Sequence, residues 1–192
     1  DTLEAAPTTG DDVGFWLYSS GSTGRPKAAI HLHSHLMQTG VLYGRGVLGL
    51  RPEDVVFSAA KLFFAYGLGN ALTFPFSVGA TAVLRAERPT PAMAMRVLAE
   101  EKPTVFCAVP TLFAAMLADE AVAAAPIPPS LRISLSAGEM LPRAVGERWS
   151  ARYGTVFLDG TGATEMLHMF LSNRLGDIRY GTTGKPVPGY SL

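Results

Sequence analysis

Short apolar runs alternate with longer amphipathic stretches along most of the chain. The short runs are bounded by Gly, Pro and charged residues, and they predict strands at 15–18, 28–33, 55–59, 81–84, 104–108, 132–136 and 155–158. In the longer stretches apolar residues recur every three or four positions. These predict helices at 34–48, 66–77, 91–101, 111–124 and 142–153. Ser34 is expected to cap the first helix.

The order of these elements indicates the fold class. From residue 55 onward strands and helices alternate one for one, and this alternation is typical of right-handed βαβ units. We therefore expect an α/β fold with a largely parallel sheet flanked by helices. Ligands on such sheets bind beyond the carboxyl ends of the strands, so the loops at those ends are the candidate functional segments.

Composition narrows the possible functions. The chain has 16 Lys and Arg against 16 Asp and Glu, so its net charge gives no reason to expect a nucleic-acid partner. Residues 62–84 carry no charge and could span a bilayer by length, but Gly67, Gly69 and Pro75 interrupt them. A buried helix followed by a strand is expected instead, without membrane insertion. The single cysteine, Cys107, excludes an internal disulfide and favours a reducing compartment, the cytoplasm.

The segment from Tyr18 to Ala28, YSSGSTGRPKA, combines glycines, hydroxyls and a lysine. Glycine lets several backbone N–H groups turn toward one anion, and the hydroxyls and the ammonium group add further donors. The expected phosphate-binding residues are Ser19, Ser20, Gly21, Ser22, Thr23, Gly24 and Lys27. The pattern is not the common P-loop, because Pro26 precedes the lysine. A flexible linker is the alternative, although linkers do not usually lie between two strands.

This segment resembles the phosphate loop of the adenylate-forming superfamily, which includes acyl-CoA synthetases, luciferases and peptide-synthetase adenylation domains. The match runs from Ser19 to Lys27, and Ala28 replaces the usual glycine. Residues 62–70, LFFAYGLGN, resemble the family's aromatic loop over the acyl pocket, although an ordinary aromatic core would read similarly.

Residues 134–142, SLSAGEMLP, resemble the turn that packs against adenine and the acyl group in that family. The resemblance implies nucleotide contacts from Ala137, Gly138 and Glu139. Glu139 stands where relatives often carry a small or apolar residue. A plain turn between a strand and a helix is the alternative.

Residues 158–170, LDGTGATEMLHMF, resemble the family segment Asn/Asp-x-Tyr-Gly-x-Thr-Glu. The resemblance implies that Asp159 reads the adenine amino group, that Thr164 contacts the α-phosphate and that Glu165 holds Mg²⁺. A carboxylate supplies the hard oxygen that Mg²⁺ prefers, although a plain surface glutamate is also possible. Gly160 and Thr161 complete the expected nucleotide contacts, and Thr161 stands where many members carry an aromatic residue.

Within the superfamily, the strings KLFFAYGLGN and TEMLH look most like the benzoate-CoA ligase branch. That branch implies a pocket for a flat aryl acid, which small and aromatic side chains suit. The expected pocket residues are Ala65, Tyr66, Cys107, Ala137, Gly162 and His168. The implied reaction activates a small aromatic carboxylic acid with ATP and Mg²⁺ and transfers the acyl group to coenzyme A.

The resemblance covers residues 1–192 and implies a partial AMP-binding (adenylation) domain. The family's N-terminal subdomain and its mobile C-terminal domain, which carries the adenylation lysine, are expected to be absent from this chain, and the chain alone is expected to be inactive. Two alternatives remain: adenylation for a carrier-protein thiol, and a nucleotide-binding module without catalysis. The three histidines His31, His33 and His35 could suit a transition metal, but no Cys or carboxylate lies nearby in the sequence, so a metal site is not expected there.

Overall fold

The computed structural model describes residues 3–19 and 24–192, and a seven-stranded sheet forms its centre. In spatial order the strands are β4 (Thr81–Val83), β3 (Val55–Ser58), β5 (Val105–Ala108), β6 (Ile133–Ser136), β7 (Val156–Gly162), β8 (Met169–Ser172) and β9 (Lys185–Pro186). The neighbours from β4 to β7 pair in parallel, which confirms the predicted fold class. The strands β8 and β9, which the sequence analysis missed, add an antiparallel edge.

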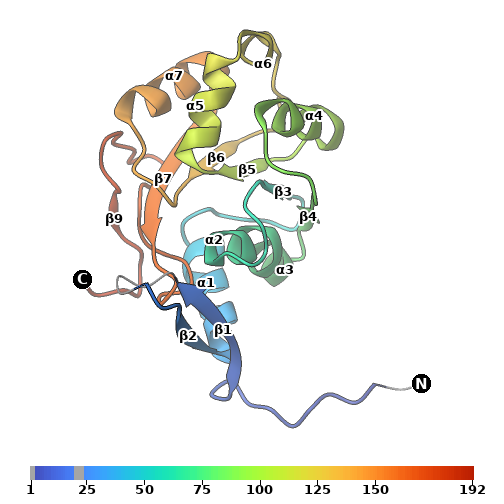
Figure 1. Ribbon diagram of the computed structural model, residues 1–192, viewed down its shortest axis with the longest axis vertical. Helices are drawn as coiled ribbons and strands as arrows, with labels where there is room; N and C mark the ends of the chain where they lie inside the picture. Colours follow the sequence, from blue (N-terminus) through green and yellow to red (C-terminus); the bar gives the residue numbers. More distant parts are fainter. Residues whose placement is uncertain (1–2, 20–23) are drawn as a thin grey trace.

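Helices cover both faces of this sheet (Figure 1). One face carries α4 (Pro91–Glu101), α5 (Pro110–Ala118), α6 (Glu120–Ala124) and α7 (Arg143–Tyr153), and the other carries α1 (His33–Thr39), α2 (Ala65–Leu68) and α3 (Phe74–Val78). Alternate residues of β5 enter different cores. Phe106 packs with Phe113 and Trp149 on the first face, whereas Cys107 belongs to the core on the second. The strand is therefore buried on both sides, as parallel strands usually are.

Two of the expected helices contain π-helical turns. The helix expected at 34–48 is α1 followed by η1 (Gly40–Arg45), and the helix expected at 66–77 is divided by η2 (Gly69–Thr73) between α2 and α3. Gly44 lies where a Cβ atom would be 3.0 Å from the Cβ of Phe74. The absence of a side chain there lets the two helical runs approach closely.

Two details of the helix ends differ from the sequence expectation. Ser34 does not cap α1, so that prediction was wrong: the helix begins one residue earlier with Leu32 as its N-cap. The N–H of Leu32 donates to Nδ1 of His35 at 3.3 Å, so the side chain of the third helical residue reaches back to the backbone of the N-cap. The helix expected at 111–124 is divided at Asp119, whose carboxylate accepts the N–H of Val122 and caps α6.

The strands β1 (Val13–Ser19) and β2 (Lys27–Leu32) form a separate antiparallel hairpin, which lies beside α1 (Figure 1). Ser19 pairs with Lys27, so the hairpin brings the two ends of the predicted phosphate loop together. The central residues of that loop, 20–23, lie outside the described residues. Among the helices that the structure describes, none is both long and apolar enough to cross a membrane.

Candidate active site

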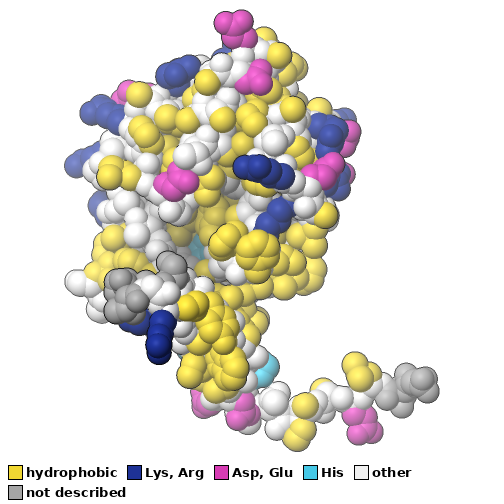
Figure 2. Space-filling model, viewed as in Figure 1, with side chains coloured by type: hydrophobic (Ala, Val, Ile, Leu, Met, Phe, Trp, Pro, Cys, Tyr) yellow, Lys and Arg dark blue, Asp and Glu magenta, His cyan; other side chains and the backbone are white. Residues whose placement is uncertain are grey.

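Two cavities meet at the carboxyl ends of β6 and β7. The smaller, of about 310 Å³, is called here the aryl cavity, and the larger, of about 630 Å³, the nucleotide cavity, after the ligands that the sequence resemblance leads us to expect there. Gly138 and Gly162 line both. The face seen in Figure 2 is hollowed near its middle, and a histidine side chain is visible inside the hollow. The site therefore lies where ligands bind in α/β folds of this type.

The aryl cavity brings together five of the predicted pocket residues. Its lining includes Ala65, Tyr66, Ala137, Gly162 and His168. Cys107 is not part of this lining, because its side chain is completely buried in the core beside β5. Burial raises the pKa of the Cys107 thiol far above its usual value, so the thiol stays protonated and packs as a small apolar group.

His168 lines the aryl cavity and is buried among aromatic rings. Its ring centroid lies 5.2 Å from that of Tyr43, 5.8 Å from that of Tyr66 and 4.5 Å from that of Phe74. Burial lowers the pKa of His168 to about 3, so the imidazole is neutral near pH 7. Within residues 3–19 and 24–192, neither ring nitrogen has a hydrogen-bond partner. A ligand in the aryl cavity would therefore meet an uncharged aromatic ring and not a cation.

Gly69 makes room for this ring, and the sequence analysis missed that role. A Cβ atom at Gly69 would lie 2.4 Å from Cδ2 of His168. Cζ of Phe74 would lie 2.9 Å away, so only glycine fits unless both rings move. The two glycines after Tyr66 suggest a close approach of another segment, but the sequence does not show that this segment is His168.

The nucleotide cavity is lined by three loops that the chain brings together from distant positions. They are residues 138–141 after β6, residues 159–162 at the end of β7, and residues 181–184. Gly138, Glu139, Asp159, Gly160 and Thr161 were expected here; Ala137 lies in the aryl cavity instead. Residues 181–184, GTTG, were missed because their place depends on the unpredicted pairing of β8 with β9.

Asp159 is the buried acid of the nucleotide cavity. Asp159 is only 4% exposed, and this burial raises the pKa of its carboxyl group to about 6. Its Oδ1 has no hydrogen-bond partner in the described part of the chain. A buried acceptor without a partner is uncommon in a folded protein, and the sequence resemblance leads us to expect an adenine amino group as its donor.

Glu139 has a structural task. Its carboxylate accepts the N–H of Thr111 and the hydroxyl of Thr111, each at 3.2 Å. Thr111 lies in the first turn of α5, where backbone N–H groups lack partners within the helix. Glu139 therefore joins the turn after β6 to the start of α5, which holds the wall shared by the two cavities.

Thr164 and Glu165 follow β7 in the loop before β8. Thr164 also lines the aryl cavity, and Glu165 is exposed. Carboxylate and hydroxyl oxygens are hard ligands, and Mg²⁺ in nucleotide sites is usually held by one or two carboxylates together with the phosphates. The oxygens of these two residues are thus of the kind that would hold such an ion.

The structure describes both ends of the predicted phosphate loop. They are Ser19 on one side and Gly24, which has φ of 81°, and Lys27 on the other.

A third cavity, of about 770 Å³, adjoins the aryl cavity and shares Phe64, Tyr66 and Gly138 with it. Its lining is mainly apolar, and Lys61 and Arg88 contribute cationic side chains. Lys61 is held in place, since its ammonium group donates to the carbonyl oxygens of Arg85 and Glu87.

Comparison with known proteins decides the family. The pattern of the AMP-binding enzymes matches residues 1–192. The chain belongs to the AMP-binding enzyme family. A benzoate–CoA ligase of Thauera aromatica is 60% identical over 100% of the chain, and a 4-hydroxybenzoate–CoA/benzoate–CoA ligase of Rhodopseudomonas palustris is 50% identical over 97%.

Solved structures of family members have the same fold. A benzoate CoA ligase from Burkholderia xenovorans superposes with a TM-score of 0.91 at 56% identity, over 98% of this chain and 37% of its own. An anthranilate CoA ligase in complex with anthranoyl-AMP gives 0.95 at 44% identity, over 100% of this chain and 37% of its own. The chain spans about a third of its curated relatives, 36% of the Thauera ligase and 34% of the Rhodopseudomonas ligase.

Proposed function

We propose that this chain is the ATP- and acid-binding part of an aryl-CoA ligase that acts on benzoate or a close relative. The observation that carries the proposal is the junction of the two cavities at Gly138 and Gly162. An acyl-adenylate has a flat acyl group joined to a nucleotide, and it would lie across that junction. The similarity to benzoate–CoA ligases over the whole chain supports the same substrate class.

The reaction would proceed in two steps. A carboxylate oxygen of the acid attacks the α-phosphorus of ATP, and the bond to the β-phosphate breaks so that pyrophosphate leaves with the electron pair. The thiolate of coenzyme A then attacks the acyl carbon, and AMP leaves with the electrons of the carbon–oxygen bond. Both steps depend chiefly on orientation and on neutralising phosphate charge.

This chain would supply the following parts of that reaction. Tyr66 and His168 would hold the aryl ring, and Asp159 would accept a hydrogen bond from the adenine amino group. Thr164 would contact the α-phosphate. When bound, Mg²⁺ would neutralise phosphate charge, and Glu165 would hold it. Ser19, Lys27 and the loop between them would bind the β- and γ-phosphates.

The remaining parts of the enzyme lie elsewhere in this proposal. Residues 1–192 would form the central part of an adenylation domain, flanked by an N-terminal subdomain and by a mobile domain that carries the adenylation lysine. The isolated chain should then show no ligase turnover. The single buried Cys107 suits a reducing compartment such as the cytoplasm.

The deciding experiment is ATP–pyrophosphate exchange by the full-length protein with a panel of aryl and alkyl acids, followed by acyl transfer to coenzyme A. We expect exchange with benzoate and small substituted benzoates, and thioester formation with coenzyme A. Exchange without transfer to coenzyme A, but with transfer to a carrier protein, would favour the carrier-thiol alternative. No exchange with any acid, despite ATP binding, would favour a non-catalytic nucleotide-binding module.

A further inference from the structure

His31 joins the hairpin to the loop that carries Thr164 and Glu165. Its Nε2 lies 2.9 Å from the carbonyl oxygen of Thr164, a residue 133 positions later in the chain. A carbonyl oxygen can only accept, so Nε2 must carry the proton in this contact. The contact is enclosed, since His31 is only 1% exposed.

The ring of His31 is held in one orientation. Phe15, its cross-strand neighbour, stacks on it with ring centroids 5.2 Å apart and planes 29° apart. His35 meets it edge-on, with ring centroids 5.5 Å apart. The direction of the Nε2–H group is therefore fixed before any ligand binds.

The same face of the hairpin carries the phosphate-loop residues. Side chains alternate between faces along a strand, so Lys27 and His31 of β2 point to one side. On β1, Ser19 and Phe15 are the cross-strand partners of these two residues. The distance along β2 from Lys27 to His31 is about 13 Å at the usual rise per residue. The hairpin thus holds the end of the phosphate loop at one end of this face and the contact to Thr164 at the other.

We propose that His31 is a positioning residue that holds the phosphate-loop hairpin in register with Thr164 and Glu165, so that the polyphosphate and its metal ion meet both segments at once. This inference rests on the proposed function. His31 itself would touch neither nucleotide nor metal. It would act through the backbone of Thr164, by fixing the loop on which Thr164 and Glu165 stand.

The test uses the full-length protein and two kinds of substitution. His31→Leu removes the donor, whereas in His31→Gln the side-chain amide can replace Nε2–H. His33→Leu is the matched control, because His33 is an exposed histidine only two residues away. Amide hydrogen exchange of residues 163–167, without nucleotide, gives a readout that does not depend on activity.

We expect His31→Leu to speed exchange in residues 163–167 and to raise the Mg²⁺ concentration for half-maximal ATP–pyrophosphate exchange by about tenfold, the effect of losing one buried hydrogen bond. His31→Gln should recover most of both effects, and His33→Leu should match the wild type. In a Glu165→Gln background, His31→Leu should add little, since both changes would weaken the same metal site, one by removing its carboxylate and the other by loosening the loop that carries it.

Two results would overturn the inference. One is unchanged amide exchange at residues 163–167 in His31→Leu. The other is a catalytic loss that is equal in the wild-type and Glu165→Gln backgrounds, because an additive effect would mean that His31 acts elsewhere. If the wild type itself shows no pyrophosphate exchange, the proposed function fails; the amide-exchange comparison then still decides whether His31 holds the loop.

Discussion

The hydroxyl group of Tyr66 donates a hydrogen bond to the carbonyl oxygen of Leu135, 2.9 Å away, and so joins α2 to β6. Burial raises the pKa of this phenol well above its usual value, so it stays a donor at all ordinary pH values. One face of the same ring lies against His168. Tyr66 is thus fixed at both its tip and its ring, which makes it a rigid wall of the aryl cavity.

Removing the hydroxyl and removing the ring should have different effects. Tyr66→Phe loses one buried hydrogen bond, worth about 1 kcal/mol of unfolding free energy, and should keep the preference for aryl acids. Tyr66→Ala removes the wall, so the KM for benzoate should rise at least about tenfold while the KM for ATP stays within about twofold. Steady-state kinetics of the full-length variants measure this. A change confined to the KM for ATP would mean that Tyr66 does not face the acid.

Substitution at Gly69 should act through His168. A Cβ atom there would overlap the imidazole ring, so Gly69→Ala should displace the ring into the aryl cavity and weaken benzoate binding by about tenfold or more. In a His168→Ala background the same substitution should have a much smaller effect, because the two shorter contacts, with Cδ2 and Nε2 of His168, are gone and only the contact of 2.9 Å with Cζ of Phe74 remains. An undiminished effect of Gly69→Ala in that background would show that the clash is not with His168. Gly10→Ala, at an exposed position with ordinary contact distances, serves as the control.

Nucleotide affinity should depend on the ionisation of Asp159. An adenine amino group needs an acceptor, and the carboxylate accepts better than the protonated acid. Because burial raises the pKa of Asp159 to about 6, affinity should increase as pH rises through about 6. Calorimetric titration with ATP between pH 5 and 8 measures the effect, and Asp159→Asn should remove the inflection. If Asp159→Asn keeps the same inflection, another group causes it.

The sign for folding is opposite to the sign for binding. The folded chain holds the Asp159 proton up to about pH 6, whereas the unfolded chain releases it near pH 4. Any stability that this group contributes is therefore present at low pH and lost as pH rises from about 4 to about 6. The carboxylate form that would accept the adenine hydrogen bond is therefore the form in which the unliganded chain is less stable.

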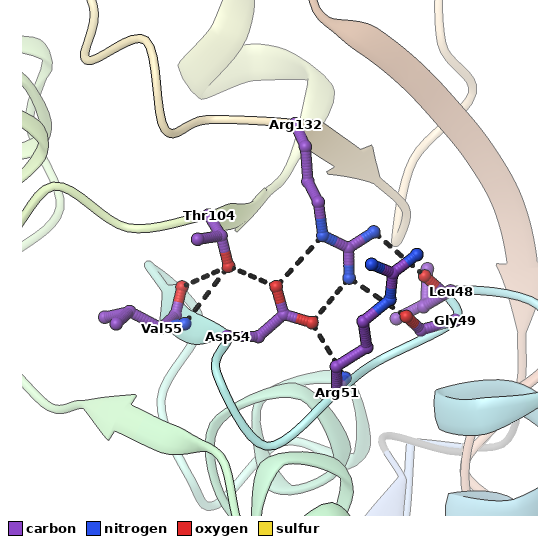
Figure 3. A network of polar contacts seen from close by, with 7 residues as sticks. All are labelled: Leu48, Gly49, Arg51, Asp54, Val55, Thr104 and Arg132. Carbon is purple, nitrogen blue, oxygen red and sulfur yellow. Dashed lines mark hydrogen bonds and ion pairs between the residues drawn. The ribbon is translucent and has the colours of Figure 1, made fainter.

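A second buried acid, Asp54, serves the fold (Figure 3). Its carboxylate accepts hydrogen bonds from Nε and Nη2 of Arg132 at 2.9 and 2.5 Å and from the hydroxyl of Thr104 at 2.6 Å. Arg132 also donates to the carbonyl oxygens of Leu48 and Gly49. The network joins the loop before β3 to the residues that directly precede β5 and β6, at the end of the sheet away from the cavities. It connects three separate parts of the chain.

Breaking this pair should destabilise the chain without altering the site. Asp54→Asn should lower the unfolding free energy by about 2 kcal/mol, since it leaves a partly buried guanidinium without its counter-charge. Thr104→Val tests the hydroxyl alone and should cost less. Chemical denaturation measures both, and the KM values of the folded variants should be unchanged. An equal loss in an Arg132→Met background would show that the two residues do not act as a pair.

The acid sensitivity of this pair follows from its pKa. Burial would raise the pKa of Asp54, but the hydrogen bonds from Arg132, Thr104 and the Arg51 N–H outweigh it and hold the pKa below its usual value. The unfolded chain therefore takes up the proton first. The stabilisation is complete at neutral pH and is lost as pH falls below about 4.

Glu165→Gln tests the metal assignment. The amide keeps the shape but loses the charge that a divalent cation requires, so pyrophosphate release should fall by two or more orders of magnitude while thermal stability is unchanged. Glu147→Gln, an exposed glutamate of α7 that pairs with Arg143, is a matched control and should keep full activity. An unchanged rate in Glu165→Gln would remove this residue from the mechanism.

The parallel strands of the sheet could be predicted from sequence because each is a short run of buried apolar residues. The apolar runs around Val56, Phe106 and Leu135 are buried on both faces, and burial of that kind is visible as continuous hydrophobicity. The strand β9 has only two residues, Lys185 and Pro186, both exposed, and carries no such signal. It forms only because β8 offers a free edge, which is a tertiary effect.

The site shows the same division. Residues within a continuous motif, such as Asp159 and Gly162, were predicted from sequence and lie together at the cavities. Gly69, His31 and residues 181–184 were missed because their roles arise between distant segments. The contact from His31 to Thr164 crosses most of the chain, and no local spacing indicates such a pair.

The central claim is that one acyl-adenylate occupies both cavities at once. A crystal structure of the full-length protein with a non-hydrolysable benzoyl-adenylate analogue tests it most directly. We predict the aryl ring between Tyr66 and the backbone of Gly162, within contact of His168, and the adenine amino group within hydrogen-bonding distance of Asp159. An aryl ring in the third cavity, beside Lys61, or an adenine remote from Asp159, would contradict this claim.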